Sequence, residues 1–192
     1  MLHNLFPSPV YDVELSLDTK PMASYCLDLK KKSNNILKSN VGGWQSSPLD
    51  KEPLPLKALF KSIVNHANKF NEVLRFKNPL RLGNSWININ GYRDYNIEHI
   101  HPGAALSGVY YIKSNSNSGN LRFLHPTKDL MSYDWSGLSW KEPNEYNSLT
   151  WWFAPIENKL FLFPSWLRHY VDPNLNKEEE RISISFNLIC SS

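Results

Sequence analysis

Apolar residues follow a helical spacing in the first 78 residues of the chain. One apolar set recurs every three or four positions and predicts an amphipathic helix; its members are Leu56, Leu59, Phe60, Ile63, Val64, Ala67, Phe70, Val73 and Leu74. An earlier helix is predicted to begin at a cap on Asp18 or Thr19, to hold Pro21 in its first turn and to end in the lysine run 30–32. Before it, the extended run 10–17 predicts an edge strand.

After residue 78 the apolar residues occur in short extended runs that turn residues interrupt. These runs predict strands at 80–90, 99–102, 106–113, 121–124, 148–155, 159–163, 169–172 and 181–190. Turn signals such as Asn90-Gly91 and Asp172-Pro173 separate them. The polar, glycine-rich segment 39–46 is interpreted as a loop. The segment 125–147 has few strand signals, and a loop of that length is usually functional, so we expect a lid with substrate contacts there.

Eight short strands after two helices favour a mainly β fold. We expect a double-sheet jelly roll, cupin-like in its core, with flanking helices packed on one face. The chain is interpreted as a single domain, 1–192, in which residues 1–78 pack on a jelly-roll core formed by residues 79–192.

Composition narrows the class of protein. The net charge is +3 without a dense basic patch, which argues against nucleic acid as a partner. No apolar run approaches the ~18–20 residues of a membrane span, and no basic stretch followed by an apolar run opens the sequence. We therefore expect a cytoplasmic protein, not a membrane protein, with free thiols at Cys26 and Cys190. An exposed edge strand would permit a homodimer.

One group of histidines suggests metal chemistry. His99 and His101 are two positions apart, so in a strand both imidazoles would point to the same face. Imidazole is a common ligand of iron, zinc, copper and nickel. His169 begins another predicted strand and is the candidate third ligand, which would leave open positions on the metal. The other three histidines are expected at the surface, in helix packing or at a loop edge; they are His3, His66 and His125.

Arg181 lies twelve residues after His169, in a run that is otherwise apolar. A buried guanidinium needs an anion, and bidentate pairing with a carboxylate satisfies it best. Ser183 would face the same way, so the two could hold one carboxylate of a dicarboxylic acid whose other end binds the metal. The competing interpretation pairs Arg181 with the acidic run 178–180, which is itself typical of a solvated turn.

Five stretches of the sequence form a familiar pattern. They are SNVGGWQS (39–46), WININ (86–90), HIHPGAALSGVYY (99–111), LFPSWLRHYV (162–171) and ERISISFN (180–187). Together they resemble the 2-oxoglutarate and Fe(II)-dependent oxygenase superfamily, and more closely a group of short oxygenases common in marine bacteria and cyanophages. The resemblance covers nearly the whole chain. It implies a double-stranded β-helix, or jelly roll, and a dioxygenase that hydroxylates an unidentified small-molecule or macromolecular substrate, in the host cytoplasm if a phage encodes it.

The resemblance also implies a metal site for Fe(II). The usual ligands of the superfamily are a His-x-Asp or His-x-Glu pair and a distal histidine. His99 matches the first ligand and His169 the distal one, while His101 stands in the carboxylate position. The neighbouring Glu98 would point to the opposite face of a regular strand.

The co-substrate 2-oxoglutarate would have its own residues. Arg181 and Ser183 match the Arg-x-Ser pair that holds the far carboxylate of 2-oxoglutarate. Asn88 stands where several members of the superfamily place a side chain that binds the co-substrate. Tyr111, or Tyr110, on the next predicted strand is a further candidate.

Two other classes of function remain open at this point. The three histidines also fit a metal enzyme that does not use 2-oxoglutarate, either a zinc hydrolase or hydratase that activates water or a cupin-type dioxygenase. A non-catalytic binding module on a jelly-roll scaffold is the third class, because a fold alone does not determine function. Arg181 and Ser183 discriminate between a 2-oxoglutarate oxygenase and a zinc enzyme, since a zinc hydratase has no need of a buried arginine there.

Overall fold

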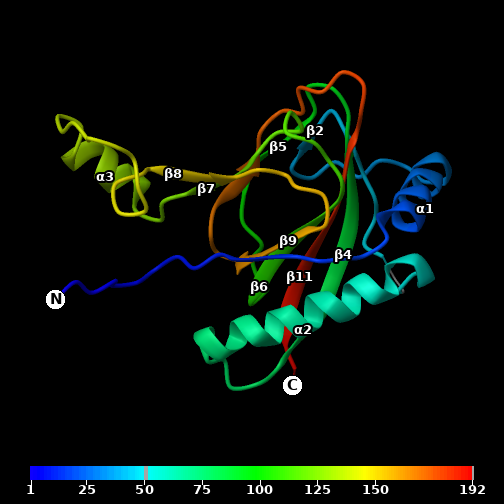
Figure 1. Cartoon of the computed structure of the whole chain (residues 1–192), viewed down its shortest axis with the longest axis horizontal. Helices are drawn as coiled ribbons and strands as arrows, with labels where there is room; N and C mark the ends of the chain where they lie inside the picture. Colours follow the sequence, from blue (N-terminus) through cyan, green and yellow to red (C-terminus); the bar gives the residue numbers. More distant parts are fainter. Residues whose placement is uncertain (50–51, 192) are drawn as a thin grey trace.

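Two antiparallel sheets form the centre of the structure, a computed structural model that describes residues 1–49 and 52–191 (Figure 1). The six-stranded sheet contains, in spatial order, β1 (Tyr11–Glu14), β9 (Lys159–Pro164), β6 (Leu106–Lys113), β11 (Arg181–Cys190), β4 (Leu80–Asn90) and β3 (Trp44–Gln45). The five-stranded sheet contains β2 (Asn40–Val41), β5 (Tyr95–His99), β10 (His169–Val171), β7 (Leu121–Leu124) and β8 (Thr150–Phe153). This arrangement agrees with the predicted double-sheet fold.

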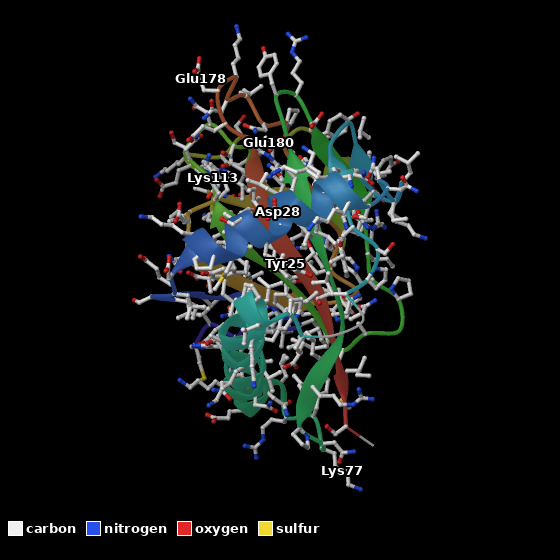
Figure 2. The ribbon with its side chains drawn as sticks, turned by 90° about the vertical axis from the view of Figure 1, so that its right-hand side faces the viewer. Tyr25, Asp28, Lys77, Lys113, Glu178 and Glu180 are labelled. Atoms are coloured by element: carbon white, nitrogen blue, oxygen red, sulfur yellow. The ribbon has the colours of Figure 1, made fainter. Side chains whose placement is uncertain are left out.

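The two predicted helices are present and cover one face of the six-stranded sheet. Helix α1 (Thr19–Lys32) begins at Asp18, whose carboxylate accepts a hydrogen bond from Lys20 N at 3.1 Å, so the predicted cap is confirmed. A 3-10 turn, η1 (Leu54–Leu56), leads into α2 (Lys57–Leu74). Figure 2 shows α1 lying across the strands. None of the helices among the described residues is long and apolar enough to cross a membrane.

The alternating faces of the central strands divide the interior into two parts. On β11, Ile182, Ile184 and Phe186 belong to the larger apolar cluster, which also contains buried residues of α1 and α2. Arg181 and Ser183 alternate with these residues on the other face of β11, where they line a cavity between the two sheets. The same alternation on three neighbouring strands therefore places apolar residues under the helices and polar residues in the cavity.

A second apolar cluster fills the rest of the space between the sheets. Its buried members are Val109, Tyr111, Leu121, Phe123, Phe161, Phe163 and Leu167, and they come from both sheets. Both thiols are free. Cys26 lies on α1 and is buried in the larger cluster, whereas Cys190 is exposed at the end of β11.

The predicted strand 99–102 is wrong in its position. The strand is β5, which ends at His99, so His101 lies beyond it in a turn. Pro102 has no N–H to donate to a sheet, and Gly103 has a φ of 86°, which breaks the extended conformation. The N–H of His101 instead donates to the carbonyl of Ser165 at 3.0 Å.

Two segments interpreted as loops contain short regular elements. In segment 39–46, Gly42 and Gly43 have positive φ values and turn the chain between β2, which pairs with β5, and β3, which pairs with β4. The segment 125–147 contains helix α3 (Lys128–Asp134), which projects from the body of the molecule beyond β7 and the edge strand β8 (Figure 1). Its aromatic residues Trp135 and Trp140 lie at the surface with ring centroids 5.4 Å apart.

Gly108 in β6 is packed so closely by its neighbours that we expect a larger side chain there to destabilise the fold. An ideal Cβ at this position would lie 2.4 Å from the carbonyl oxygen of Phe161 and 2.4 Å from Cζ of Phe186. We expect Gly108→Ala to lower the free energy of unfolding by about 1–3 kcal/mol, because a packed core cannot accept the added methyl group. The measurement is the urea midpoint against that of Gly137→Ala, whose Cβ would meet no atom within 4 Å. Equal midpoints for the two variants would contradict the expectation.

Candidate metal centre

Three histidines from two distant stretches of the chain meet at the edge of the cavity. His99 ends β5 and His169 begins β10, and the two residues are direct partners across this antiparallel pair. His101 reaches the same place from the turn after β5. One ring nitrogen of each histidine can be chosen so that all three lie within 4.8 Å of one another. The ring centroids of His99 and His169 are 4.4 Å apart.

Backbone carbonyls orient two of the three rings. Nδ1 of His169 lies 2.9 Å from the carbonyl oxygen of Leu167, and Nδ1 of His99 lies 2.7 Å from that of Ile97. A carbonyl only accepts, so in both rings Nδ1 carries the proton and Nε2 keeps a free lone pair, the usual second contact of a metal-binding histidine.

The distance between the Nε2 atoms of two of the histidines is suitable for binding one metal ion. Nε2 of His101 lies 3.2 Å from Nε2 of His169. Two nitrogen ligands at a bond length of about 2.0–2.1 Å and a right angle would be about 3 Å apart. The donor set therefore fits a first-row transition metal.

Burial keeps the three imidazoles neutral. Desolvation, followed by the nearby His99 ring, lowers the pKa of His169 to about 3 and that of His101 to about 4. Desolvation also lowers the pKa of His99, against the hydrogen bond to Ile97, which raises it. At neutral pH all three rings are therefore neutral imidazoles, each with one ring nitrogen that can bind a metal without first losing a proton.

The cavity beside the histidines brings together seven of the residues that the sequence singled out as candidates. Its lining includes Asn88, His99, His101, Tyr111, His169, Arg181 and Ser183. Residues far apart in the chain thus form one site. Among the described residues that line the cavity none is an aspartate or glutamate, and Arg181 is the one with a fixed charge.

Arg181 opens β11 and is 1% exposed. Its Nη1 donates to the carbonyl of Ser118, whereas its Nη2 is buried and has no hydrogen-bond partner among the described residues. The competing pairing with the acidic run 178–180 is not seen. Within that run, Glu179 pairs with Lys113 at 3.2 Å and Glu180 with Lys30 at 2.6 Å. Burial lowers the pKa of Arg181, and the phenol of Tyr111 and the carboxylates of Asp94 and Asp172 oppose that effect.

Asn88, Ser183 and Tyr111 lie side by side on three adjacent strands, because Ser183 is the register partner of both neighbours. Burial raises the pKa of Tyr111 to about 12, so its phenol stays a neutral hydrogen-bond donor. The amide of Asn88 donates to Ser185 Oγ at 2.9 Å, and its Oδ1 is buried without a partner among the described residues. Tyr110, the alternative to Tyr111, points to the opposite face and donates to Asn158 Oδ1.

Sequence reasoning missed other residues of this site, and three of them stand out. The ring of Trp86 lies 5.6 Å from that of His101, and the ring of Phe163 lies 4.6 Å from that of His169. Ser185 also lines the cavity. Trp86 and Ser185 stand two positions from predicted site residues on β4 and β11, so the two-residue period of a strand could have found them.

The remaining histidines and Glu98 lie outside the site. His66 Nδ1 is 2.8 Å from the phenol oxygen of Tyr11, and His125 is near Thr127 at the start of α3. Glu98 points away from the histidines and lies 3.5 Å from Arg168, as expected for a residue on the other face of β5.

Solved structures share this fold at low sequence identity. A prolyl-4-hydroxylase from Pseudomonas putida superposes with a TM-score of 0.67 and 13% identity, over 96% of this chain and 94% of that chain. SnoN, an alpha-ketoglutarate-dependent epimerase of nogalamycin biosynthesis, gives 0.67 and 15% over 96% and 80%. HygX from Streptomyces hygroscopicus, with nickel and 2-oxoglutarate bound, gives 0.58 and 11% over 96% and 84%. These likenesses show a double-stranded β-helix.

Comparison with curated proteins gives no match. The family model described as 2OG-Fe(II) oxygenase, where 2OG is 2-oxoglutarate, matches residues 84–187. This range is more than half of the 192 residues and includes all seven candidate site residues. The chain therefore belongs to the 2OG-Fe(II) oxygenase family, whose enzymes use Fe(II) and 2-oxoglutarate.

Proposed function

We propose that this enzyme hydroxylates an organic substrate at an Fe(II) ion held by His99, His101 and His169. The observation that carries the proposal is the unpartnered Nη2 of buried Arg181 in the same cavity as three converging, neutral imidazoles. Fe(II) with 2-oxoglutarate and dioxygen supplies the oxidation of a substrate C–H bond, with release of succinate and carbon dioxide. The protein supplies the ligands, the binding of the co-substrate and a sheltered cavity.

Charge balance supports a dicarboxylate as the second occupant. The three proposed metal ligands are neutral, so they do not offset the two positive charges of the ion. Arg181 adds a third positive charge, and none of the described residues that line the cavity is acidic. A 2-oxo acid with two carboxylates would bring two negative charges, one for each end of the site.

Asn88, Ser183 and Tyr111, side by side in the cavity, would contact the co-substrate between the metal and Arg181. We assign the far carboxylate to Arg181 Nη2 and to the hydroxyl of Ser183, two positions further along the same face of β11. The neutral phenol of Tyr111 can donate to a carboxylate. For Asn88 the side-chain NH2 is the group that can donate to the co-substrate, and its Oδ1 can only accept, for example from water.

Aromatic side chains would shelter the metal. Trp86 lies against His101, and Phe163 lies against His169 and within the apolar cluster between the sheets. These rings border the histidines on the two sides and exclude water from part of the site. We propose that the substrate approaches along the part that they leave open.

Loss of any one ligand should weaken the metal site. We expect His99→Ala, His101→Ala and His169→Ala each to lower the affinity for Fe(II) by at least about tenfold, since three side chains share the ion. Anaerobic titration with Fe(II) measures the affinity. His125→Ala is the matched control and should bind as the wild type does. His101→Asp should keep binding, because a carboxylate is also a ligand. Full iron binding and turnover in His99→Ala would refute the ligand assignment.

Removing the guanidinium should weaken the binding of 2-oxoglutarate and leave the metal in place. Hydrogen bonds to charged groups contribute about 1.5–3 kcal/mol, so Arg181→Ala should raise the half-saturating 2-oxoglutarate concentration about 10- to 150-fold. The readout is the visible charge-transfer band of the anaerobic Fe(II) protein, which we expect only when both Fe(II) and 2-oxoglutarate are present. Ser183→Ala should give a smaller shift. Absence of the band in the wild type, with tight zinc binding instead, would favour a hydrolytic metal enzyme.

A further inference from the structure

The guanidinium of Arg181 is held by backbone carbonyls from two segments. Its Nη1 donates to the carbonyl of Ser118 and lies 3.4 Å from the carbonyl oxygens of Gly119 and of Asp172. Ser118 and Gly119 belong to the turn 115–119 between β6 and β7, and Asp172 follows β10. We call these three carbonyls the carbonyl cradle.

Hydrogen bonds within the turn fix the Ser118 carbonyl. Oδ1 of Asn115 accepts from Asn117 N at 3.0 Å and from Ser118 Oγ at 3.2 Å, and Ser118 Oγ accepts from Asn115 N at 3.0 Å. Ser118 N also donates to the carbonyl of Asn115 at 3.0 Å. Ser118 is only 1% exposed, so the turn is ordered against the interior although its tip is at the surface.

The turn also packs tightly against the segment after β10. An ideal Cβ on Gly119 would lie 2.1 Å from the carbonyl oxygen of Asp172 and 2.8 Å from that of Pro173. Gly119 has a φ of 84°, which also favours glycine. Two hydrogen bonds close the contact, from Asp172 N to the carbonyl of Asn120 and from Leu175 N to that of Asn117.

The cradle holds the charge of Arg181 without neutralising it. Carbonyl dipoles orient a guanidinium but carry no net charge. The two nearest carboxylates have other partners: Asp172 pairs with Arg122 at 2.7 Å, and Asp94 accepts from Gly91 N at 2.7 Å. Among the described residues, no carboxylate forms an ion pair with Arg181. The full positive charge and the free Nη2 are therefore left to a ligand in the cavity.

We propose that the turn 115–119 is a positioning element of the co-substrate site, and that its tight contact with Asp172 sets the affinity of the cavity for the far carboxylate of the 2-oxo acid. The inference rests on the proposed function, in which Arg181 binds that carboxylate. Gly119 acts through Arg181 and does not itself contact the co-substrate. A side chain at this position would push the Ser118 and Asp172 carbonyls apart and move the guanidinium away from the cavity.

The test compares two 2-oxo acids on the nickel-loaded protein by calorimetry. Gly119→Ala should raise the dissociation constant of 2-oxoglutarate by at least about tenfold. The same variant should bind pyruvate, which has the 2-oxo acid end but no far carboxylate, within about twofold of the wild type. Gly137→Ala is the control, since a Cβ there would meet no atom within 4 Å and Gly137 does not line the cavity. Its affinity for 2-oxoglutarate should stay within about twofold of the wild type.

Each result decides the proposal. A folded Gly119→Ala protein with wild-type affinity for 2-oxoglutarate would overturn the positioning role, and so would parallel losses of 2-oxoglutarate and pyruvate, which indicate general damage. If Gly119→Ala does not fold, Asn115→Ala loosens the turn from its outer side and should show the same selective loss. Wild-type protein that binds nickel but not 2-oxoglutarate would reject the proposed function itself.

Discussion

The two-residue period of three adjacent strands is the constraint on which the cavity depends. On β4, β11 and β6, one face supplies the apolar cluster that packs under the helices, and the other supplies Asn88, Ser183 and Tyr111. A slip of one residue in the register of β11 would place Ile182 in the cavity and Arg181 under the helices. The packing of the larger core therefore also determines which side chains enter the cavity, because the same strands supply both.

The electrostatics of the cavity follow from the burial of its histidines and its arginine and from the lack of a carboxylate partner among the described residues. Three imidazoles are neutral because they are desolvated, and the charge of the arginine is unpaired because carbonyls, not carboxylates, accept from its guanidinium. The site thus accumulates positive potential that only a ligand can offset.

Sequence patterns predicted the elements better than the connections between them. Strong alternation located β4, β6 and β11, and the apolar stripe located α2. The turn at His101 was missed because the i, i+2 spacing looked like a strand, although Pro102 and Gly103 could have ended it. The seven site residues came from side-chain chemistry and a family resemblance. The carbonyl cradle could not have been predicted, since backbone carbonyls leave no trace in the sequence and only the fold brings them together.

The three histidines differ in what fixes them to the protein. His99 and His169 face each other across a strand pair, so the sheet's hydrogen bonds hold the spacing between them. His101 stands in a turn whose N–H is tied to Ser165, outside both sheets. A metal bound by these three rings would therefore have two ligands on a rigid sheet edge and one on a turn. A ligand position on a turn can change its chemistry, from imidazole to carboxylate, without repacking a strand, which makes it the natural place for relatives with one scaffold to diverge.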